Sequence, residues 1–131
     1  MGITWAGKIL IVKDSLREWE LISRYLGDWG YKIVKASSDK EALEIALEQR
    51  PDAIDTNVVM TGMSGFELCR FLKINLSSQK MPIVICSNKN QAVHHAWARK
   101  QGADVYLTKP YTAEDLLSAI KLATEWNCIL S

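Results

Sequence analysis

KILIVKDSLRE, residues 8–18, passes directly from the pattern of a buried strand to that of a capped helix. Apolar residues on consecutive positions, Ile9 to Val12, are typical of a parallel strand that is covered on both faces. Ser15 and Glu18 then form a Ser-x-x-Glu capping box, in which each side chain satisfies a free backbone donor at a helix start. We therefore predict a strand over 8–12 and a helix from about 16 to 26, ended by Gly27.

The same alternation of a short apolar run and a capped amphipathic stretch recurs along the chain. Further strands are predicted over 31–36, 52–57, 82–87 and 104–108, and a helix follows each of them. Strands that alternate with helices in this way form a parallel sheet with right-handed crossovers and helices on both faces. The predicted fold class is therefore α/β and doubly wound, and ligands of such folds gather outside the carboxyl ends of the strands.

Composition limits the classes of function. The 131 residues suit one domain, and 16 Lys and Arg against 15 Asp and Glu create no field that attracts nucleic acid or an anionic membrane. No apolar run approaches the roughly 20 residues that span a bilayer, so we expect a cytoplasmic protein with no membrane partner. Residues 8–124 are predicted to form the domain, after an extension over 1–7 and before a tail over 125–131 that is either a helix extension or the start of a linker.

Polar residues stand where the predicted strands end. Lys13 and Asp14 follow the first strand, Asn57 ends the third, Ser87 ends the fourth and Lys109 follows the fifth. A polar residue at one strand end needs no function, because strand ends meet water. Four such ends converge at one edge of a parallel sheet, which favours a common site.

Three segments resemble response-regulator receiver domains of the CheY type: ILIVKDS (9–15), PDAIDTNVVMTGMSG (51–65) and GADVYLTKP (102–110). The resemblance implies a flavodoxin-like (βα)5 fold with a five-stranded sheet of order 2-1-3-4-5. It also implies an aspartate after the third strand that accepts a phosphoryl group, two acids after the first strand that hold Mg²⁺, a Ser or Thr after the fourth strand, and a Lys before Pro.

Five positions of this chain are compared with that pattern. Asp14, Ser87 and Lys109 match it. Lys13 stands in place of the first acid, and Asn57 stands in place of the phosphoacceptor. The resemblance, which covers residues 8–123, is therefore to a receiver that is altered at its phosphorylation site.

The two departures remove the chemistry of phosphoryl transfer. An acyl phosphate forms when a carboxylate oxygen attacks phosphorus, and the amide of Asn57 has no anionic oxygen. The transfer also relies on a metal ion to neutralise charge, and Mg²⁺ usually binds through one or two carboxylates. Asp14, Lys13 and Lys109 together carry a formal charge of plus one, which should repel the ion. We predict no metal and no cofactor, with Mg²⁺ bound only if the pocket is less altered than these residues indicate.

Asp55 lies two residues before Asn57, so it faces the same side of the strand but deeper in the sheet. A buried carboxylate is costly unless it is paired or protonated, and Lys13 on the neighbouring strand is the first candidate partner. We hypothesise that the Lys13 ammonium takes the space and charge of the metal ion and bridges Asp14 and the amide oxygen of Asn57. Natural divergence and an engineered block both stay open as origins of Asn57, although the second departure at Lys13 favours divergence.

The resemblance also implies an output face, made by the fourth helix, the fifth strand and the fifth helix. In receivers the residues at the positions of Ser87 and Tyr106 move together and reshape this face. For Tyr106 an ordinary amphipathic ring at a sheet edge is an equally good interpretation. His94 and His95 diverge by about 100° on a helix, which favours surface histidines over a metal pair. Trp97 is assigned to the core, slightly in preference to a partner-binding role.

The leading hypothesis for function is a pseudo-receiver, a two-component signalling module that binds a protein through the output face without aspartyl phosphorylation. Candidate partners are a histidine kinase or a motility or output protein, because residues 85–91, Trp97 and residues 100–103 resemble regulators of cyanobacterial type IV pilus motility and phototaxis. The alternative is a conventional phosphoacceptor regulator whose Asp was replaced by Asn57. We expect no nucleic-acid partner in either case.

An enzyme or a flavoprotein of the same fold is the third class. A flavodoxin needs a phosphate loop rich in Ser and Thr after the first strand, whereas residues 12–18 offer one hydroxyl. No Ser-His-Asp or metal-ligand constellation appears elsewhere. Cys69, Cys86 and Cys128 are too far apart in the sequence for a metal-binding pair or a redox motif, so we predict that they are reduced packing residues. With no catalytic constellation in the sequence, we predict no enzymatic activity.

Overall fold

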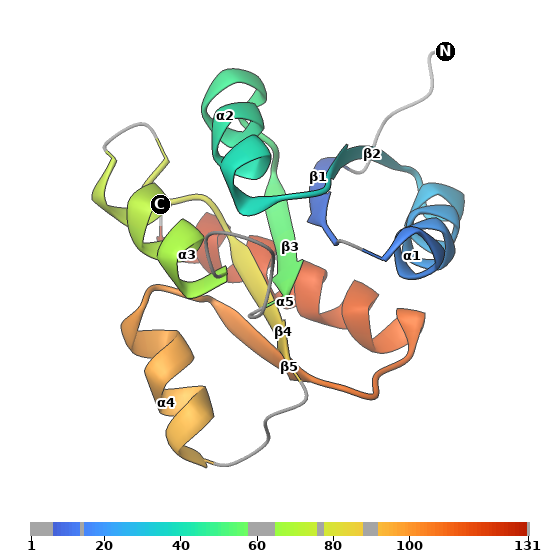
Figure 1. The fold of residues 1–131 in the computed structure, drawn as a ribbon. Coiled ribbons are helices and arrows are strands. Elements are labelled where there is room, and N and C mark those ends of the chain that lie inside the picture. The colour runs from blue at the N-terminus through green and yellow to red at the C-terminus, as the bar shows by residue number, and fades with distance from the viewer. Residues whose placement is uncertain (1–6, 14, 58–64, 76–77, 88–91, 131) are drawn as a thin grey trace.

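A computed structural model describes residues 7–13, 15–57, 65–75, 78–87 and 92–130. Its strands are β1 (Gly7–Val12), β2 (Tyr31–Ala36), β3 (Ala53–Asn57), β4 (Ile83–Ser87) and β5 (Val105–Thr108). Its helices are α1 (Leu16–Asp28), α2 (Asp39–Gln49), α3 (Gly65–Ile74), α4 (Ala92–Lys100) and α5 (Ala113–Leu130). The strands form one parallel sheet of order β2-β1-β3-β4-β5 (Figure 1), which confirms the predicted fold class and strand order.

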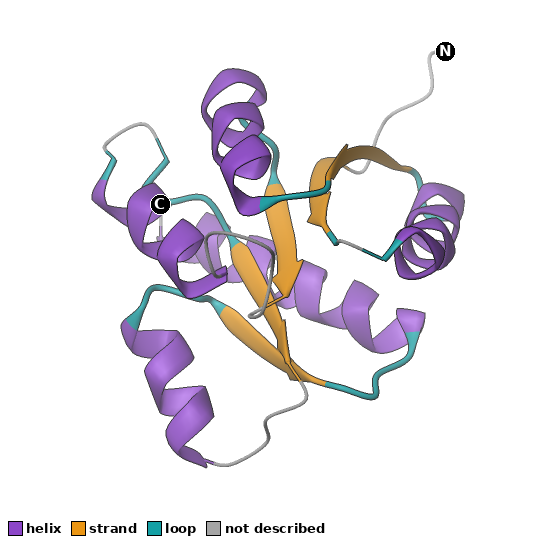
Figure 2. Cartoon of the chain, viewed as in Figure 1, coloured by secondary structure: helices purple, strands orange, loops and turns teal. Residues whose placement is uncertain are grey.

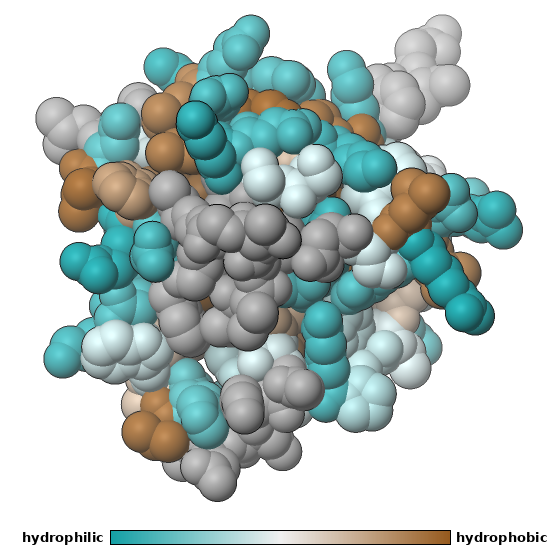
Figure 3. Space-filling view, viewed as in Figure 1, coloured by the Kyte–Doolittle hydropathy of each residue, from teal (hydrophilic) through white to brown (hydrophobic). Residues whose placement is uncertain are grey.

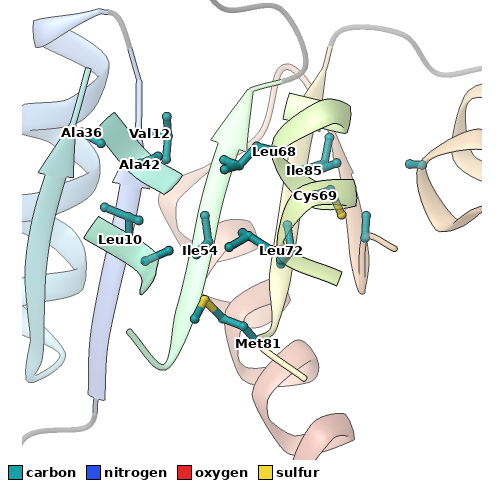
Figure 4. Packing of buried hydrophobic residues seen from close by; sticks show 14 residues of the cluster. Leu10, Val12, Ala36, Ala42, Ile54, Leu68, Cys69, Leu72, Met81 and Ile85 are labelled. Atoms are coloured by element: carbon teal, nitrogen blue, oxygen red, sulfur yellow. The ribbon is translucent and has the colours of Figure 1, made fainter. Parts of the chain in front are cut away.

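The sheet separates two layers of helices (Figure 2). Leu10 and Val12 of β1 belong to the apolar cluster with α2, α3 and α4, whereas Ile9 and Ile11 belong to the cluster with α1 and α5. Figure 4 shows the first cluster, in which Leu72 of α3 lies against the strands. Because side chains alternate along a strand, the side chain of Lys13, two positions beyond Ile11, is expected on the same side of the sheet as α1 and α5.

Side-chain caps fix where the first two helices begin. The backbone N–H of Glu18 donates to Ser15 Oγ at 3.3 Å, and that of Glu41 donates to Ser38 Oγ at 3.2 Å. Each cap satisfies a backbone donor that the helix itself leaves free. The serine caps of two predicted capping boxes are thus confirmed, whereas the described contacts of the Glu18 and Glu41 carboxylates are with other groups than the cap N–H. The predicted box at Ser64 begins outside the described residues. Glu18 and Glu41 consequently occupy the same place in the first turn of their helices.

The ends of two helices differ from the prediction. Helix α1 continues through Gly27 to Asp28, and the positive φ, 92°, falls at Gly30. The prediction for Gly27 is wrong because the left-handed conformation that favours glycine is adopted three residues later. Helix α5 extends to Leu130, so the helix extension is the interpretation of the tail that the structure supports.

The outer surface is largely polar on the face seen in Figure 3, where apolar side chains lie apart from one another among hydrophilic ones. Scattered apolar side chains are ordinary on a protein surface. Over the described residues, no helix combines the length and the apolar character that crossing a bilayer requires.

Candidate functional site

Lys13 extends from the end of β1 into the interior. Its backbone N–H donates to the Ala36 carbonyl at 3.2 Å, so the chain stays beside β2 for one residue beyond the strand. Only 1% of Lys13 is exposed. Removing an ammonium group from water costs free energy that only paired and hydrogen-bonded neighbours can offset. The site is therefore defined by the groups that surround this one nitrogen.

The ends of β3 and β4 supply the deepest of those groups. Lys13 Nζ donates to Asn57 Oδ1 at 2.9 Å and lies 3.5 Å from each carboxylate oxygen of Asp55. Asp55 is fully buried and also accepts a hydrogen bond from the Cys86 thiol at 3.0 Å. The predicted pair of Asp55 and Lys13 is confirmed, and so is the predicted contact with the Asn57 oxygen. Asp14, the other group that the hypothesis placed at the ammonium, lies outside the described residues.

Sheet register explains why these side chains meet. Asn57 of β3 is paired with Cys86 of β4, and Ile11 of β1 is paired with Asp55. Cys86 and Ile11 both belong to the apolar cluster with α1 and α5. Side chains at Lys13, Asp55, Asn57 and Cys86 therefore share one side of the sheet and one end of its strands.

Helix α1 and the segment after β5 close the site. Glu18 Oε1 lies 3.5 Å from Lys13 Nζ and 3.6 Å from Lys109 Nζ. Tyr111 donates its hydroxyl to the same oxygen at 3.4 Å and accepts from Lys13 Nζ at 3.2 Å. A single carboxylate oxygen thus meets two ammonium groups and a phenol. The side chains of Glu18 and Lys109 are 29% and 33% exposed, so this end of the site reaches solvent.

The protonation states follow from these surroundings. Burial lowers the pKa of Lys13, but the groups around it, Asp55 first and then Cys86 and Glu18, together raise it, so the pKa stands above the ordinary 10.5. Burial raises the pKa of the Cys86 thiol and of the Tyr111 phenol. At neutral pH Lys13 is therefore a cation, and both neighbours remain protonated hydrogen-bond donors.

The pocket holds more negative charge than the sequence count included. The sequence count included the side chains of Asp14, Lys13 and Lys109, whose formal charges sum to plus one. The structure adds the carboxylates of Asp55 and Glu18, so among the described residues two ammonium groups are matched by two carboxylates. The predicted excess of positive charge is therefore wrong, because the chain supplies its own counter-charges from β3 and α1.

Glu18 and Tyr111 are the site residues that the sequence did not single out. Glu18 stood out only as the acid of a capping box. Charge was the usable signal, because two lysines at strand ends along one edge of the sheet need an acid nearby, and the first turn of the helix after β1 lies at that edge. Tyr111 has a weaker signal, its place two residues after Lys109 in the segment that follows β5.

Comparisons with known proteins show the family. The chain matches the model of the response regulator receiver domain over residues 9–121. It is 34% identical to protein PilH of Pseudomonas aeruginosa over 113 residues, which cover 86% of this chain and 93% of PilH. This chain belongs to the response regulator receiver domain family. Protein PilG of the same organism is 29% identical to this receiver domain over 114 residues, covering 87% and 84% of the two chains.

Solved structures agree with that membership. Chemotaxis response regulator CheY4 of Vibrio cholerae superposes with a TM-score of 0.84 at 30% identity, covering 90% of this receiver domain and 98% of CheY4. Response regulator MprA of Mycobacterium leprae is 33% identical over 114 residues, but this chain spans only 49% of its length. The predicted CheY-like receiver of two-component signalling is confirmed. The resemblance to cyanobacterial pilus and phototaxis regulators stays a prediction.

A receiver domain implies Mg²⁺ at this edge of the sheet, and the described side chains do not fit it. The Asn57 oxygen accepts a hydrogen bond from the Lys13 ammonium 2.9 Å away, and the Asp55 carboxylate pairs with the same ammonium. Mg²⁺ requires oxygen ligands in near-octahedral geometry, with no fixed cation among them. Within the described part of the chain, no group of three or more His, Cys, Asp or Glu side chains is placed to hold a metal ion.

The predicted switch residues lie at β4 and β5. Tyr106 packs against the cluster of α2, α3 and α4, and its ring centre lies 4.4 Å from that of His95, with the planes inclined by 49°. Ser87 is paired with Thr108, and the backbone N–H of Lys109 donates to the Ser87 carbonyl at 2.6 Å. The structure thus brings the backbones of Ser87 and Lys109 together and adds His95 as a neighbour of Tyr106 that the sequence did not predict.

Helix α4 has exposed apolar side chains on the predicted output face, which is formed by α4, β5 and α5. Trp97 is 50% exposed, and Lys100 Nζ lies 5.7 Å from its ring centre. The core assignment of Trp97 is wrong because the helix turns the neighbouring Ala98 inward, where it is fully buried. Val93 of α4 and Leu122 of α5 are also exposed.

Proposed function

We propose that this receiver domain signals in the cytoplasm by binding a protein partner, without accepting a phosphoryl group at Asn57. The observation that supports this most directly is the buried hydrogen bond of 2.9 Å from Lys13 Nζ to Asn57 Oδ1. Phosphoryl transfer requires an anionic oxygen at this position and a metal ion to neutralise the developing charge. An amide beside a fixed cation offers neither.

The charges around Lys13 support a pocket that is held in one state. In a receiver that switches, the phosphoryl group brings new charge to the site. Here the ammonium is already paired with Asp55 and Glu18, both within 3.5 Å. We infer that this pocket needs no Mg²⁺ and that its arrangement is set when the chain folds.

Intact-mass spectrometry after incubation with acetyl phosphate and Mg²⁺ tests the proposal. The wild type and Asn57→Asp should both gain no phosphoryl group, because Lys13 still occupies the metal position. Asn57→Asp combined with Lys13→Asp should gain one, provided that circular dichroism shows the variant folded. Asn75→Asp, which adds the same charge on the exposed surface, is the matched control.

Two outcomes of that experiment contradict the proposal. Phosphorylation of the wild type would show that another residue accepts the group. Phosphorylation of Asn57→Asp alone would show that Lys13 is tolerated, and it would favour the conventional phosphoacceptor regulator. Calorimetric titration of the wild type with Mg²⁺ adds an independent check, since binding in the millimolar range or tighter would contradict the absence of a metal site.

We further propose that the partner, a histidine kinase or an output protein, binds the face formed by α4, β5 and α5. Exposed Trp97, Val93 and Leu122 supply apolar contacts, and tryptophan is enriched among residues that dominate binding energy. Tyr106, held against His95, lies on the same face. A hollow of about 210 Å³ lined by His95, Tyr106 and Leu122 adds a concave feature to it.

Co-purification from cells of the source organism tests this face. Trp97→Ala should lose the partner that the wild type captures, because it removes an exposed aromatic ring without disturbing the core. Trp29→Ala removes a ring of similar exposure, 54% against 50%, from the end of α1 and should retain the partner. Loss in both variants, or in neither, would contradict the proposed face.

A further inference from the structure

Glu18 occupies an unusual position among the charged groups of the site. Its Oε1 lies within 3.6 Å of two ammonium groups, Lys13 Nζ and Lys109 Nζ, and it accepts a hydrogen bond from Tyr111. A Glu at this place in a capping box ordinarily turns back to the start of its own helix. Here it turns instead toward β1 and toward the segment that follows β5.

The three groups that meet Glu18 form a cradle for an oxyanion. Two cations and one hydroxyl donor converge on one oxygen, and such donors bind carboxylate, phosphate and sulfate alike. Lys13 directly follows β1, whereas Lys109 and Tyr111 come from the segment between β5 and α5. Helix α1 contributes only the anion, and among the polar contacts described Glu18 is the residue that joins α1 to both other parts of the cradle.

We propose that Glu18 is an internal counter-ion, which fills an oxyanion cradle made by Lys13, Lys109 and Tyr111 and thereby fastens the segment after β5 to α1. This inference rests on the proposed function in one respect, since a pocket without an incoming phosphoryl group needs an anion of its own. Glu18 is a positioning residue in this role, because it acts through the placement of Lys109 and Tyr111.

Solvent can reach the cradle. A hollow of about 810 Å³ opens between α1 and the segment after β5, and Glu18, Lys109 and Tyr111 are among the residues that line it. Neutralising Glu18 leaves Lys109 without its described carboxylate, while Lys13 keeps Asp55. A small oxyanion from solution should then be able to take the vacant place. The proposal thus predicts a phosphate site that exists only when Glu18 is neutral.

Glu18→Gln and Glu41→Gln form a matched pair for the test. Both residues follow their N-cap serine by three positions, so both changes remove the same favourable interaction with the helix dipole. Glu41 is exposed, and its carboxylate accepts a hydrogen bond from Ser37 at 3.3 Å, with no ammonium group among its described contacts. Any loss of stability in Glu18→Gln beyond the loss in Glu41→Gln is therefore due to the contacts of Glu18 with the cradle.

Three measurements on the intact chain apply. The midpoint of thermal unfolding should fall by about 3 °C or more in Glu18→Gln relative to Glu41→Gln, since a charge network is lost in a domain of this size. Lys109 should be acetylated severalfold faster by acetic anhydride in Glu18→Gln, as read by peptide mass spectrometry. Inorganic phosphate, at an ionic strength matched with sodium chloride, should raise the midpoint of Glu18→Gln more than that of either other protein.

Equal midpoints and equal Lys109 labelling in the two variants would overturn the proposal. A phosphate effect of the same size in all three proteins would overturn it as well, because general salting effects act on every folded surface alike. None of these measurements involves a phosphoryl donor or a partner protein. Failure of the cradle and failure of the proposed function are therefore distinguishable.

Discussion

Two lysine–aspartate pairs stand at opposite ends of the sheet. Lys13 and Asp55, at the carboxyl ends of the strands, are 3.5 Å apart with both side chains fully buried. Lys73 and Asp104, at the amino ends, are 3.4 Å apart with side chains 21% and 15% exposed. The two separations are nearly equal, so distance does not distinguish a structural pair from a functional one.

The difference lies in what else each pair contacts. Lys73 Nζ donates to the Met81 carbonyl at 2.9 Å, and Asp104 Oδ2 accepts from the Ile83 backbone N–H at 2.7 Å. Both partners at the amino end are thus fixed by backbone groups that every sequence provides. This pair joins α3 to the starts of β4 and β5, and its role is structural.

The pair at the carboxyl end depends on other side chains. Lys13 is surrounded by Asn57, Tyr111 and Glu18, and Asp55 accepts from the Cys86 thiol. Side chains change by mutation far more readily than backbone groups do. A buried assembly of side chains at the carboxyl ends of the strands, where ligands of this fold gather, is therefore the arrangement that selection can change, and the comparison favours this end of the sheet for the proposed site.

The largest expected effect comes from removing one charge of the buried pair. Asp55→Asn should lower the free energy of unfolding by about 3–5 kcal/mol, because it leaves a buried ammonium with a weaker partner. Asp104→Asn should cost only about 1–2 kcal/mol, since the amide oxygen still accepts from Ile83 and water reaches the pair. Urea unfolding of both variants measures the contrast, and equal losses at the two ends would break the comparison.

A second change sharpens the same contrast. Lys13→Met added to Asp55→Asn removes the unpaired ammonium and keeps an unbranched side chain of similar length. More than half of the lost stability should return, because replacing both members of a buried pair is far less costly than removing one. Adding Lys73→Met to Asp104→Asn should return little, since Lys73 is partly exposed and its charge is solvated. A double variant at the buried end as unstable as Asp55→Asn would show that the ammonium is not the source of the loss.

Much of the fold could be predicted from the sequence because its signals are local. Consecutive apolar residues in β1 and the serine caps at Ser15 and Ser38 are set by neighbours in the chain. The end of α1 was misplaced because Gly27 and Gly30 are both near it, and only the three-dimensional path decides which adopts positive φ. Trp97 was misplaced because the short helix α4 carries alanine at several positions, and its apolar pattern does not fix which side faces the sheet.

The site could be predicted only as far as strand geometry reaches. Asn57 and Lys13 follow from strand ends, and Asp55 follows from alternation along β3. Glu18 and Tyr111 reach the ammonium from a helix and from the segment after β5, whose placement depends on how α1 and α5 pack. That packing is a tertiary property, and the charge balance of the pocket was wrong for the same reason.

A smaller effect is expected from crowding the amino-end pair. Gly102 has φ 104°, and a Cβ there would lie 2.5 Å from Lys73 Cγ. Gly102→Ala should cost about 1–3 kcal/mol through backbone strain and displacement of Lys73. Gly27→Ala is the matched control, because its surroundings are open and it is helical, so it should be neutral or stabilising by about 0.5–1 kcal/mol. Equal thermal midpoints for the two variants would argue against a packed contact at Lys73.

The smallest expected effect is a pH dependence at the amino end. Burial raises the pKa of the Cys69 thiol from the ordinary 9.0 to about 12. The folded state therefore favours the protonated thiol, and this contribution is complete below about pH 9 and is lost as the pH rises toward 12. Cys69→Ala should make the decline in unfolding free energy between pH 8 and pH 10 shallower than in the wild type, whatever the cavity costs at neutral pH. Burial also raises the pKa of Cys86, but this thiol is present in both proteins, so its contribution cancels when the two slopes are compared. An unchanged slope would mean that the thiolate is tolerated beside Lys73, and the amino end would then be wetter than its burial indicates.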